Sequence, residues 1–393
     1  MKMSTSTTLF ILFFMMISSS YSVNFSATRS GSLHFNLPEV KIPILCKTLL
    51  EIPFYIVELG FGTPKQYFDL LFDTGSYLTW IQCKPCEVRC FNQKRPVFDP
   101  SLSFSYAAIP CHSIDCSLVK SVTYPKLPCS ITCKYFMDYH SDVSSMGDFA
   151  REVLHLSPNN VIPGFIFGCG QNNSGSPEIF DGILGIQNNM LSLVDQASSM
   201  YGRVFSFCLP SEPTSKGFLM LGGSRVLSQF RYTPLVRLSN SERGYNINLV
   251  GVGTVDQNVS VPHFPVLIDT GSRLSLLPSS VYVPLRSAVR KALSKYTPIA
   301  KDPENPFDTC YETRSLKEGG IPPVDITLQF EGGVDLKLPQ SRVLQDLSLA
   351  TCIPIVELKN GKSGILGGIQ LQTLEVLIDV ANSRMGFAEK KCG

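Results

Sequence analysis

The sequence predicts a mostly β protein built from two related lobes, and three observations lead to this fold class. The chain has 393 residues, too long for one compact core and suggestive of about two domains. Past residue 50, short apolar runs alternate with Gly, Pro, Asn and Ser, which is typical of strands joined by turns. Two motifs also recur in the same order in the second half. We therefore expect two β lobes related by an approximate two-fold axis, with a central cleft between them.

The N-terminus has the pattern of a secretory signal peptide. Lys2 precedes an apolar run from Leu9 to Ile17, and Ser20-Tyr21-Ser22 provides small residues for cleavage. A membrane anchor is the alternative, but it needs about 18 continuous apolar residues, and this run is shorter. We expect residues 1–22 to be a signal peptide and residues 23–50 a short propeptide-like segment. The mature protein should be secreted, to the apoplast or, alternatively, the vacuole.

The first lobe is expected to span residues 51–225. It opens with the strand pattern Phe54–Leu59, which the turn sequence Gly60–Pro64 ends. The pattern loosens into Ser, Gly, Pro and Arg between Cys208 and Tyr245, which indicates the lobe boundary there. The second lobe then covers residues 226–393.

Thirteen cysteines in a chain with a signal peptide indicate disulfides, because thiols oxidise outside the reducing cytosol. Seven of them lie between Cys83 and Cys133. The spacing of Cys83, Cys86 and Cys90 also fits zinc ligands, but a secreted chain favours disulfides. The odd count leaves one cysteine over, and Cys46 is the candidate. Possible glycosylation sequons begin at Asn24, Asn172 and Asn258.

In the second lobe, helical periodicity is clearest from Pro278 to Tyr296. Apolar residues recur there every four positions on one face. They are Val281, Leu285, Val289 and Leu293.

The internal repeat consists of two pairs of motifs. The sequence LLFDTGS at 70–76 is echoed by VLIDTGS at 266–272, and GILG at 182–185 is echoed at 364–367. A single DTGS could be an ordinary Asp turn cap. Two copies related by a two-fold axis would instead bring two symmetric loops together and place Asp73 against Asp269. The GILG glycines would let a following strand pack close behind each loop.

The DTGS motifs supply the chemistry that we expect at this site. Each glycine lets backbone N–H groups approach the carboxylate, and the Thr and Ser hydroxyls are expected to hold its outer oxygens. The supporting residues are thus Thr74, Gly75, Ser76, Thr270, Gly271 and Ser272.

Two carboxyls at hydrogen-bonding distance share one proton, because both cannot ionise cheaply. The ionised member can take a proton from a water molecule while the protonated member donates to a peptide carbonyl. The pair Asp73 and Asp269 therefore predicts peptide-bond hydrolysis at acidic pH without a metal, a cofactor or a covalent intermediate.

With these motifs the chain resembles the pepsin-type aspartic proteases, specifically their plant nepenthesin-like branch, from about Phe54 to Cys392. The resemblance rests on DTGS followed by Trp80, on the cysteine-rich insert from Cys83 to Cys116, and on Phe167–Gly170, Phe205–Leu209, Phe307–Tyr311 and Ile365–Gly367. It implies a bilobal pepsin-like fold and an endopeptidase that cleaves protein or peptide substrates. It also implies a hairpin flap whose tyrosine closes over the substrate.

The flap is where the sequence departs from the family. Tyr139 aligns with the flap tyrosine and is expected to hydrogen-bond the indole of Trp80; alternatively, Tyr139 is a packed strand residue and Trp80 simply core. The family's YGDGS becomes Tyr139-His140-Ser141-Asp142-Val143, so both tip glycines are replaced. A second departure is Tyr77, where the branch usually has Asp.

Other function classes receive less support. Lys and Arg total 34 against 32 Asp and Glu, so the net charge of +2 provides no broad basic surface for nucleic acid or anionic membranes. HExxH and GxSxG motifs are absent. The resemblance offers one rival, a binding protein like the relatives that inhibit plant cell-wall-degrading enzymes. Those relatives typically break a DTG motif, whereas both are intact here, which favours the enzyme. We expect the enzyme to be a monomer.

Overall fold

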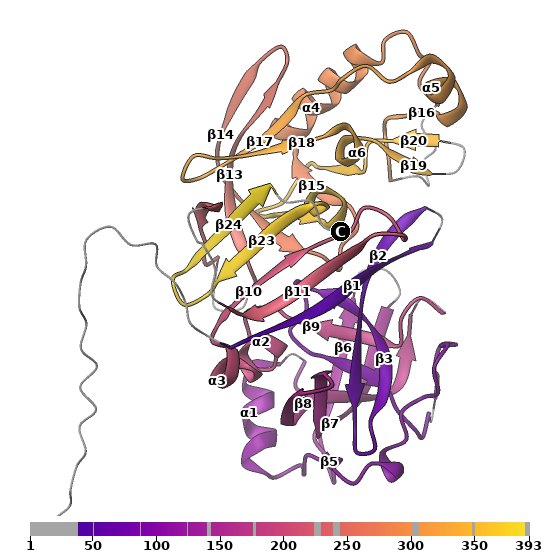
Figure 1. Cartoon of the computed structure of the whole chain (residues 1–393), viewed down its shortest axis with the longest axis vertical. Coiled ribbons are helices and arrows are strands. Elements are labelled where there is room, and N and C mark those ends of the chain that lie inside the picture. The colour runs from indigo at the N-terminus through magenta and orange to yellow at the C-terminus, as the bar shows by residue number, and fades with distance from the viewer. Residues whose placement is uncertain are drawn as a thin grey trace, which may run out of the picture.

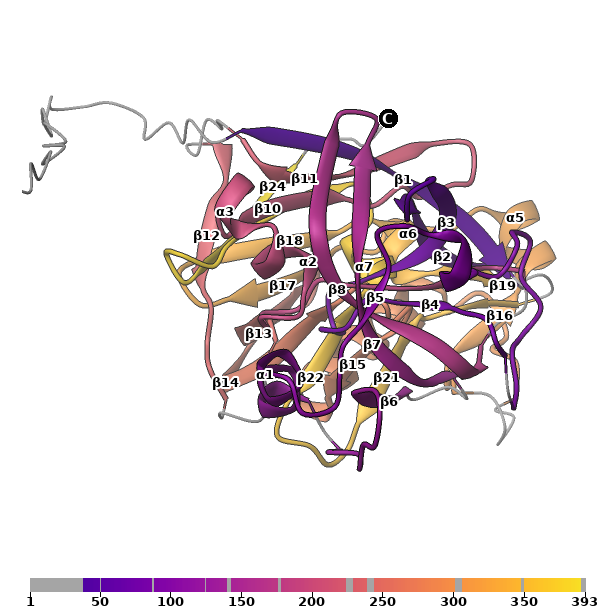
Figure 2. The same ribbon diagram turned by 90° about the horizontal axis from the view of Figure 1, so that it is seen from below.

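The computed structural model describes residues 38–389 apart from 50, 87, 124, 140–142, 176–177, 224–228, 239–243, 301–305 and 348–349. The predicted signal peptide, the first sequon at Asn24 and the flap tip at 140–142 lie outside the described residues. The chain is mostly β and forms two lobes, with the first half of the sequence below and the second half above in Figure 1. Figure 2 shows the N-terminal lobe in front of the orange and yellow C-terminal lobe.

The largest sheet has fourteen strands and runs through the N-terminal lobe and between the lobes. In spatial order it contains β12 (Arg231–Pro234), β24 (Arg384–Glu389), β23 (Leu374–Asp379), β10 (Val204–Cys208), β11 (Lys216–Gly222), β1 (Glu39–Leu49), β2 (Ile52–Phe61), β3 (Gln66–Asp73), β9 (Gly182–Gly185), β4 (Trp80–Gln82), β8 (Asn160–Ser174), β7 (Val143–Ser157) and β5 (Ala107–Ala108), with β6 (Lys134–Tyr139) paired to β7.

Two smaller sheets form the C-terminal lobe. The seven-stranded sheet has the order β18 (Val334–Leu338), β17 (Ile326–Phe330), β13 (Asn246–Thr254), β14 (Asn258–Asp269), β22 (Gly364–Gly367), β15 (Ser275–Pro278) and β21 (Ile355–Leu358). The three-stranded sheet has the order β16 (Cys310–Glu312), β20 (Ala350–Cys352) and β19 (Gln345–Leu347).

Short helices lie on the sheets and between them. They are α1 (Ile114–Val122), α2 (Leu193–Gln196), α3 (Ser198–Tyr201), α4 (Ser279–Ala292), α5 (Thr313–Gly319), α6 (Gln340–Val343), α7 (Gly368–Leu371) and the 3₁₀ turn Pro100–Leu102. The helix expected at 278–296 is confirmed as α4, and all four of its periodic apolar residues are buried. This is the amphipathic arrangement that the four-residue spacing predicts.

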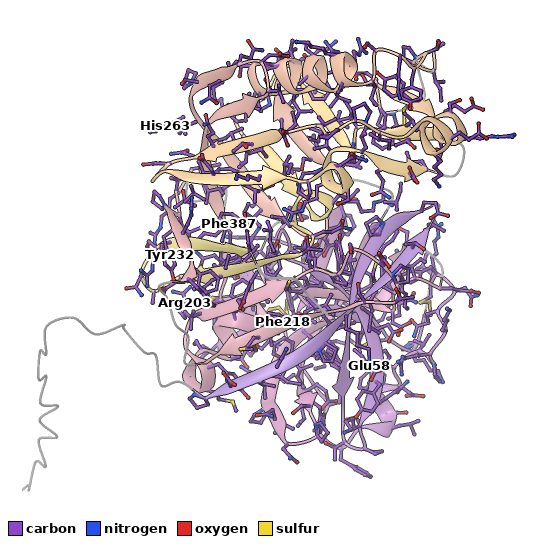
Figure 3. The ribbon with its side chains drawn as sticks, turned by 45° about the horizontal axis from the view of Figure 1, so that its top comes forward. Glu58, Arg203, Phe218, Tyr232, His263 and Phe387 are labelled. Carbon is purple, nitrogen blue, oxygen red and sulfur yellow. A yellow bond between two sulfur atoms is a disulfide. The ribbon has the colours of Figure 1, made fainter. Side chains whose placement is uncertain are left out.

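The division between the sheets does not follow the division of the sequence. Strands β23 and β24 come from the C-terminal half, yet β23 pairs with β10 and so extends the large sheet. Phe387 of β24 stacks on Phe330 of β17 with ring centroids 6.0 Å apart, which joins the large sheet to the C-terminal lobe; Phe387 is labelled in Figure 3. The two lobes therefore share a continuous layer of strands.

Strand β1 lies inside the large sheet, between β11 and β2. Its residues alternate between exposed and buried from Glu39 to Cys46, as in a strand with one face on the core. The described part of the segment expected to be propeptide-like is thus a paired strand. Cys46 is buried in β1 and is the one free cysteine among the described residues, as its isolation in the sequence predicts.

The cysteine-rich insert is held by disulfides, as predicted. The described bonds are Cys83–Cys169, Cys86–Cys90, Cys111–Cys129, Cys116–Cys133 and, in the C-terminal lobe, Cys310–Cys352. Cys208 is also disulfide-bonded. The zinc interpretation of Cys83, Cys86 and Cys90 is therefore wrong, because all three sulfurs are in disulfides.

The two pairs of repeated motifs form the same local structure in both lobes. Strand β3 runs parallel to β9, with Asp73 beside Gly185, and β14 runs parallel to β22, with Asp269 beside Gly367. A Cβ at Gly185 would lie 2.6 Å from the backbone of Leu78, and one at Gly367 would lie 2.3 Å from the carbonyl oxygen of Leu274. Only glycine permits this approach, as the sequence predicts.

Candidate active site

The two DTGS loops meet at the junction of the lobes, at the ends of β3 and β14. A Cβ on Gly75 would lie 2.7 Å from Cγ of Asp269, and a Cβ on Gly271 would lie 2.4 Å from Cγ of Asp73. Each glycine thus packs against the carboxyl of the opposite lobe, where no side chain would fit. The two carboxyls themselves lie within hydrogen-bonding reach of one another. The predicted pairing of Asp73 with Asp269 is present in the structure.

Both carboxyls are held by the same set of donors. Oδ1 of Asp73 accepts from the backbone N–H groups of Gly75 and Ser76 at 2.8 and 3.1 Å, and its Oδ2 accepts from the Ser76 hydroxyl. Oδ1 of Asp269 likewise accepts from the N–H groups of Gly271 and Ser272 at 3.0 and 3.1 Å. Its Oδ2 accepts from the Ser272 hydroxyl at 2.7 Å. Each carboxyl is therefore fixed by its own loop while facing its partner.

The two threonines do not hold the carboxylates, and on this point the sequence expectation is wrong. The hydroxyl of Thr74 donates to the carbonyl of Ile268 at 2.8 Å and accepts from the N–H of Thr270 at 3.0 Å. The hydroxyl of Thr270 donates to the carbonyl of Phe72 at 2.7 Å and accepts from the N–H of Thr74 at 3.1 Å. Because the two loops lie back to back, the nearest unpaired backbone groups belong to the other lobe. The threonines therefore tie the lobes together beneath the carboxyl pair.

The surroundings of the two carboxyls differ. Asp73 is 5% exposed, whereas Asp269 is partly exposed. Burial, and then the charge of Asp269, raise the pKa of Asp73 well above its usual range. Two such carboxyls titrate as a pair that shares a proton, so one can act as base while the other acts as acid.

Tyr139 and Trp80 lie where the resemblance implies. The indole N–H of Trp80 donates to the hydroxyl of Tyr139 at 3.1 Å, and the phenol also hydrogen-bonds Ser76. Tyr139 ends β6 and pairs with Val143 of β7, so it sits at the end of a hairpin. Since Ser76 bonds Asp73, a chain of hydrogen bonds runs from Trp80 through Tyr139 to the carboxyl. Burial raises the pKa of Tyr139, which keeps the phenol protonated.

Three residues near the loops carry no motif of their own. The side-chain amide of Gln187 donates to the carbonyl of Gly75 at 2.7 Å, and the hydroxyl of Tyr245 donates to the carbonyl of Ile186 at 2.8 Å. Arg273 follows the second DTGS directly. The sequence could have indicated two of them by their position shortly after a repeated motif, since residue 187 follows GILG and residue 273 follows DTGS.

Other kinds of site receive no support in the described part of the chain. No group of three or more His, Cys, Asp or Glu side chains there could hold a metal ion. No helix among these residues is long and apolar enough to cross a membrane. A cavity of about 1390 Å³ lies away from the carboxyl pair, between β18, α6 and strand β24 of the large sheet.

Comparisons with known proteins agree with this geometry. The family model "Xylanase inhibitor N-terminal" matches residues 55–223, and "Xylanase inhibitor C-terminal" matches residues 244–389. An aspartyl protease family protein of Arabidopsis thaliana is 34% identical over 86% of this chain and 72% of its own length. The aspartic proteinase nepenthesin-1 of Nepenthes gracilis is 30% identical over 86% of this chain and 78% of its own.

Solved structures show the same fold. Soybean basic 7S globulin superposes with a TM-score of 0.70 at 21% identity, covering 90% of this chain and 96% of the globulin. An aspartic proteinase from Irpex lacteus superposes with a TM-score of 0.62 at 18% identity, covering 90% of this chain and 98% of the proteinase. Together with the family models and the plant relatives, these matches show that the chain belongs to the pepsin-like plant aspartic protease family.

Proposed function

We propose that this protein is a secreted, monomeric aspartic endopeptidase in which Asp73 and Asp269 activate a water molecule to hydrolyse peptide bonds. The observation that carries the proposal is the meeting of two carboxyls, each held by its own glycine N–H, serine N–H and serine hydroxyl. A pair of carboxyls sharing one proton is the established pattern of aspartic proteases.

The geometry supports the following chemistry. One carboxylate takes a proton from a water molecule, whose oxygen forms a bond to the carbonyl carbon of the substrate. The protonated carboxyl donates to the carbonyl oxygen, which gives a tetrahedral diol. Collapse of the diol breaks the C–N bond, and the amine leaves with a proton from the pair. Burial and the charge of Asp269 raise the pKa of Asp73, which supports a pair that holds one shared proton.

The test is cleavage of an unfolded protein substrate between pH 3 and pH 8 by the oxidised chain from Val23 onward. Asp73→Asn and Asp269→Asn should each abolish cleavage, as should pepstatin. Asp181→Asn is the matched control, because Asp181 is also a buried aspartate of the N-terminal lobe, at 2% exposure, and lies outside the site. Acid-peaked cleavage that both site variants lose and the control keeps is the expected result. If a folded sample cleaves nothing at any pH, the proposal that this protein is an endopeptidase is wrong.

A binding protein is the second candidate, and the descriptions of the two family models favour it. A folded but inactive chain should then inhibit a cell-wall-degrading enzyme such as a xylanase at stoichiometric concentration. Unchanged xylanase activity would exclude that alternative.

Secretion is supported by the signal-like N-terminus and by the disulfides. A fluorescent protein fused behind residues 1–22 in plant cells should reach the apoplast, and the same fusion without them should stay inside the cell. Vacuolar fluorescence would redirect the proposal to that compartment.

A further inference from the structure

Arg273 is a partly exposed cation that directly follows the second DTGS motif in the sequence. It follows Ser272, whose hydroxyl holds Asp269. Its guanidinium lies over the ring of Phe54, 4.8 Å from the centroid. Phe54 belongs to β2 of the N-terminal lobe and is 7% exposed, so the contact crosses the lobe junction. The ring supports one face of the guanidinium and leaves the edge with its N–H donors available.

Within the part of the chain that the structure describes, Arg273 has no carboxylate partner. Its side chain makes neither an ion pair nor a hydrogen bond with another described residue. Its guanidinium instead contacts the aromatic ring of Phe54. Some of the other described arginines pair with a carboxylate, namely Arg95, Arg151, Arg203, Arg286, Arg314 and Arg384. Burial lowers the pKa of Arg273, although a guanidinium stays charged throughout the working range of a protein. An unpaired, partly desolvated cation gains more from an incoming anion than an exposed cation does.

The charge of Arg273 has no counterpart at the equivalent position of the N-terminal lobe. The residue that follows the first DTGS is Tyr77, and its ring packs against the apolar cluster of the N-terminal lobe that includes Trp80 and Phe180. The equivalent position of the C-terminal lobe is Arg273. The position after DTGS therefore carries a cation in the C-terminal lobe and an aromatic ring in the N-terminal lobe.

We propose that Arg273 binds an acidic side chain of the peptide substrate and so directs cleavage to bonds near a Glu or Asp. The inference rests on the proposed endopeptidase function and adds a substrate class to it. A guanidinium held on an aromatic ring can accept a carboxylate through two parallel N–H···O bonds, a geometry that an amide of the same size cannot match with equal strength.

The experiment uses pairs of peptides that differ only by Glu or Gln at one of the four positions on either side of the cut bond. It is run at pH 5, where a free Glu with a pKa of about 4.3 is mostly ionised. At one position, the wild-type protein should cleave the Glu peptide with a kcat/KM about tenfold or more above that of the Gln peptide, as expected for a charge-assisted hydrogen bond. In Arg273→Met the ratio of the two kcat/KM values should fall to about 1.

The matched control is Lys41→Met, which removes one positive charge that also lies over an aromatic ring. Lys41 is exposed on β1, with Nζ 4.6 Å from the ring centroid of Phe218, which Figure 3 labels. This variant should keep the wild-type Glu/Gln ratio. Arg273→Lys should keep part of the preference because the charge remains while the fork is lost. Arg273→Lys also replaces Arg273→Met as the test variant if Arg273→Met does not fold.

Two negative outcomes can be told apart. If the wild type cleaves both peptides of every pair and the ratios do not change in Arg273→Met or Arg273→Lys, the inference about Arg273 is wrong and the endopeptidase proposal stands. If the folded wild type cleaves none of the peptides and no protein substrate, the proposed function itself fails and the inference falls with it.

Discussion

Replacing Thr74 with Val should destabilise the whole protein, because Thr74 joins the two lobes beneath the carboxyl pair. Val has nearly the same shape as Thr but no hydroxyl. The change removes the donor to the Ile268 carbonyl and the acceptor for the Thr270 N–H. Thr74 is 0% exposed, so both backbone groups would be left buried without these partners. Each such group costs about 1–3 kcal/mol, so the free energy of unfolding should fall by about 2–6 kcal/mol.

The measurement is equilibrium unfolding in urea at neutral pH with the disulfides intact. Trp80 is the only tryptophan and is 0% exposed, so its fluorescence reports unfolding of the N-terminal lobe, and circular dichroism reports both lobes. Thr79→Val is the matched control. Thr79 is equally buried, but its hydroxyl accepts a single bond, from the N–H of Gly185 in the same lobe at 3.1 Å.

The control should lose about 1–3 kcal/mol, and its two probes should continue to report one transition. Thr270→Val should match Thr74→Val, because the two hydroxyls make separate and equivalent pairs of bonds. A loss below about 0.5 kcal/mol in Thr74→Val, with an unchanged urea dependence, would refute the reasoning. It would mean that the backbone groups find other partners when the hydroxyl is gone.

The remaining predictions concern single side chains near the pair. Asp73→Asn should raise the melting temperature at pH 7 but not at pH 3. Because the pKa of Asp73 is raised in the folded protein, the unfolded chain ionises first as pH rises above about 3.9, the ordinary pKa, and the folded state loses stability. Equal melting temperatures of variant and wild type at pH 7 would contradict this. Asp181→Asn should act similarly, with the gain developing as pH rises toward 6, since burial raises the pKa of Asp181 to about 6; thermal unfolding across this range tests it. Tyr139→Phe should lower kcat/KM about tenfold or more, because it removes the hydrogen bonds to Trp80 and Ser76 and each is worth about 1 kcal/mol. Unchanged kinetics would mean that the Tyr139 hydroxyl has no role in cleavage.

The carboxyl pair could be predicted from the sequence because its geometry is local and repeated. Each Asp is held by the N–H groups two and three residues later, so the DTGS motif contains most of the information needed to orient its own carboxyl. The GILG glycines carry a similarly local signal, since a strand can pack behind the loop only where no Cβ intervenes. The buried face of α4 could be predicted because its apolar residues recur every four positions, which is also a local pattern.

The contacts between distant segments could not be predicted in this way. The threonine hydroxyls bond backbone groups about half the chain away, and no spacing within a motif indicates such partners. Strand β1 was not expected in the sheet interior, because its pairing with β11 depends on a segment far along the chain. The pairing of β23 with β10 also crosses the sequence boundary between the lobes. Pattern reasoning finds elements more reliably than it finds their partners.

The duplicated motifs make two carboxyls with the same internal bonds, and the two halves then make them different. Asp73 is buried near Tyr139 and Trp80, whereas Asp269 is partly exposed and its DTGS motif is followed by Arg273. An acid and a base cannot be told apart in a perfectly symmetric pair, so the distinction must come from residues outside the repeat.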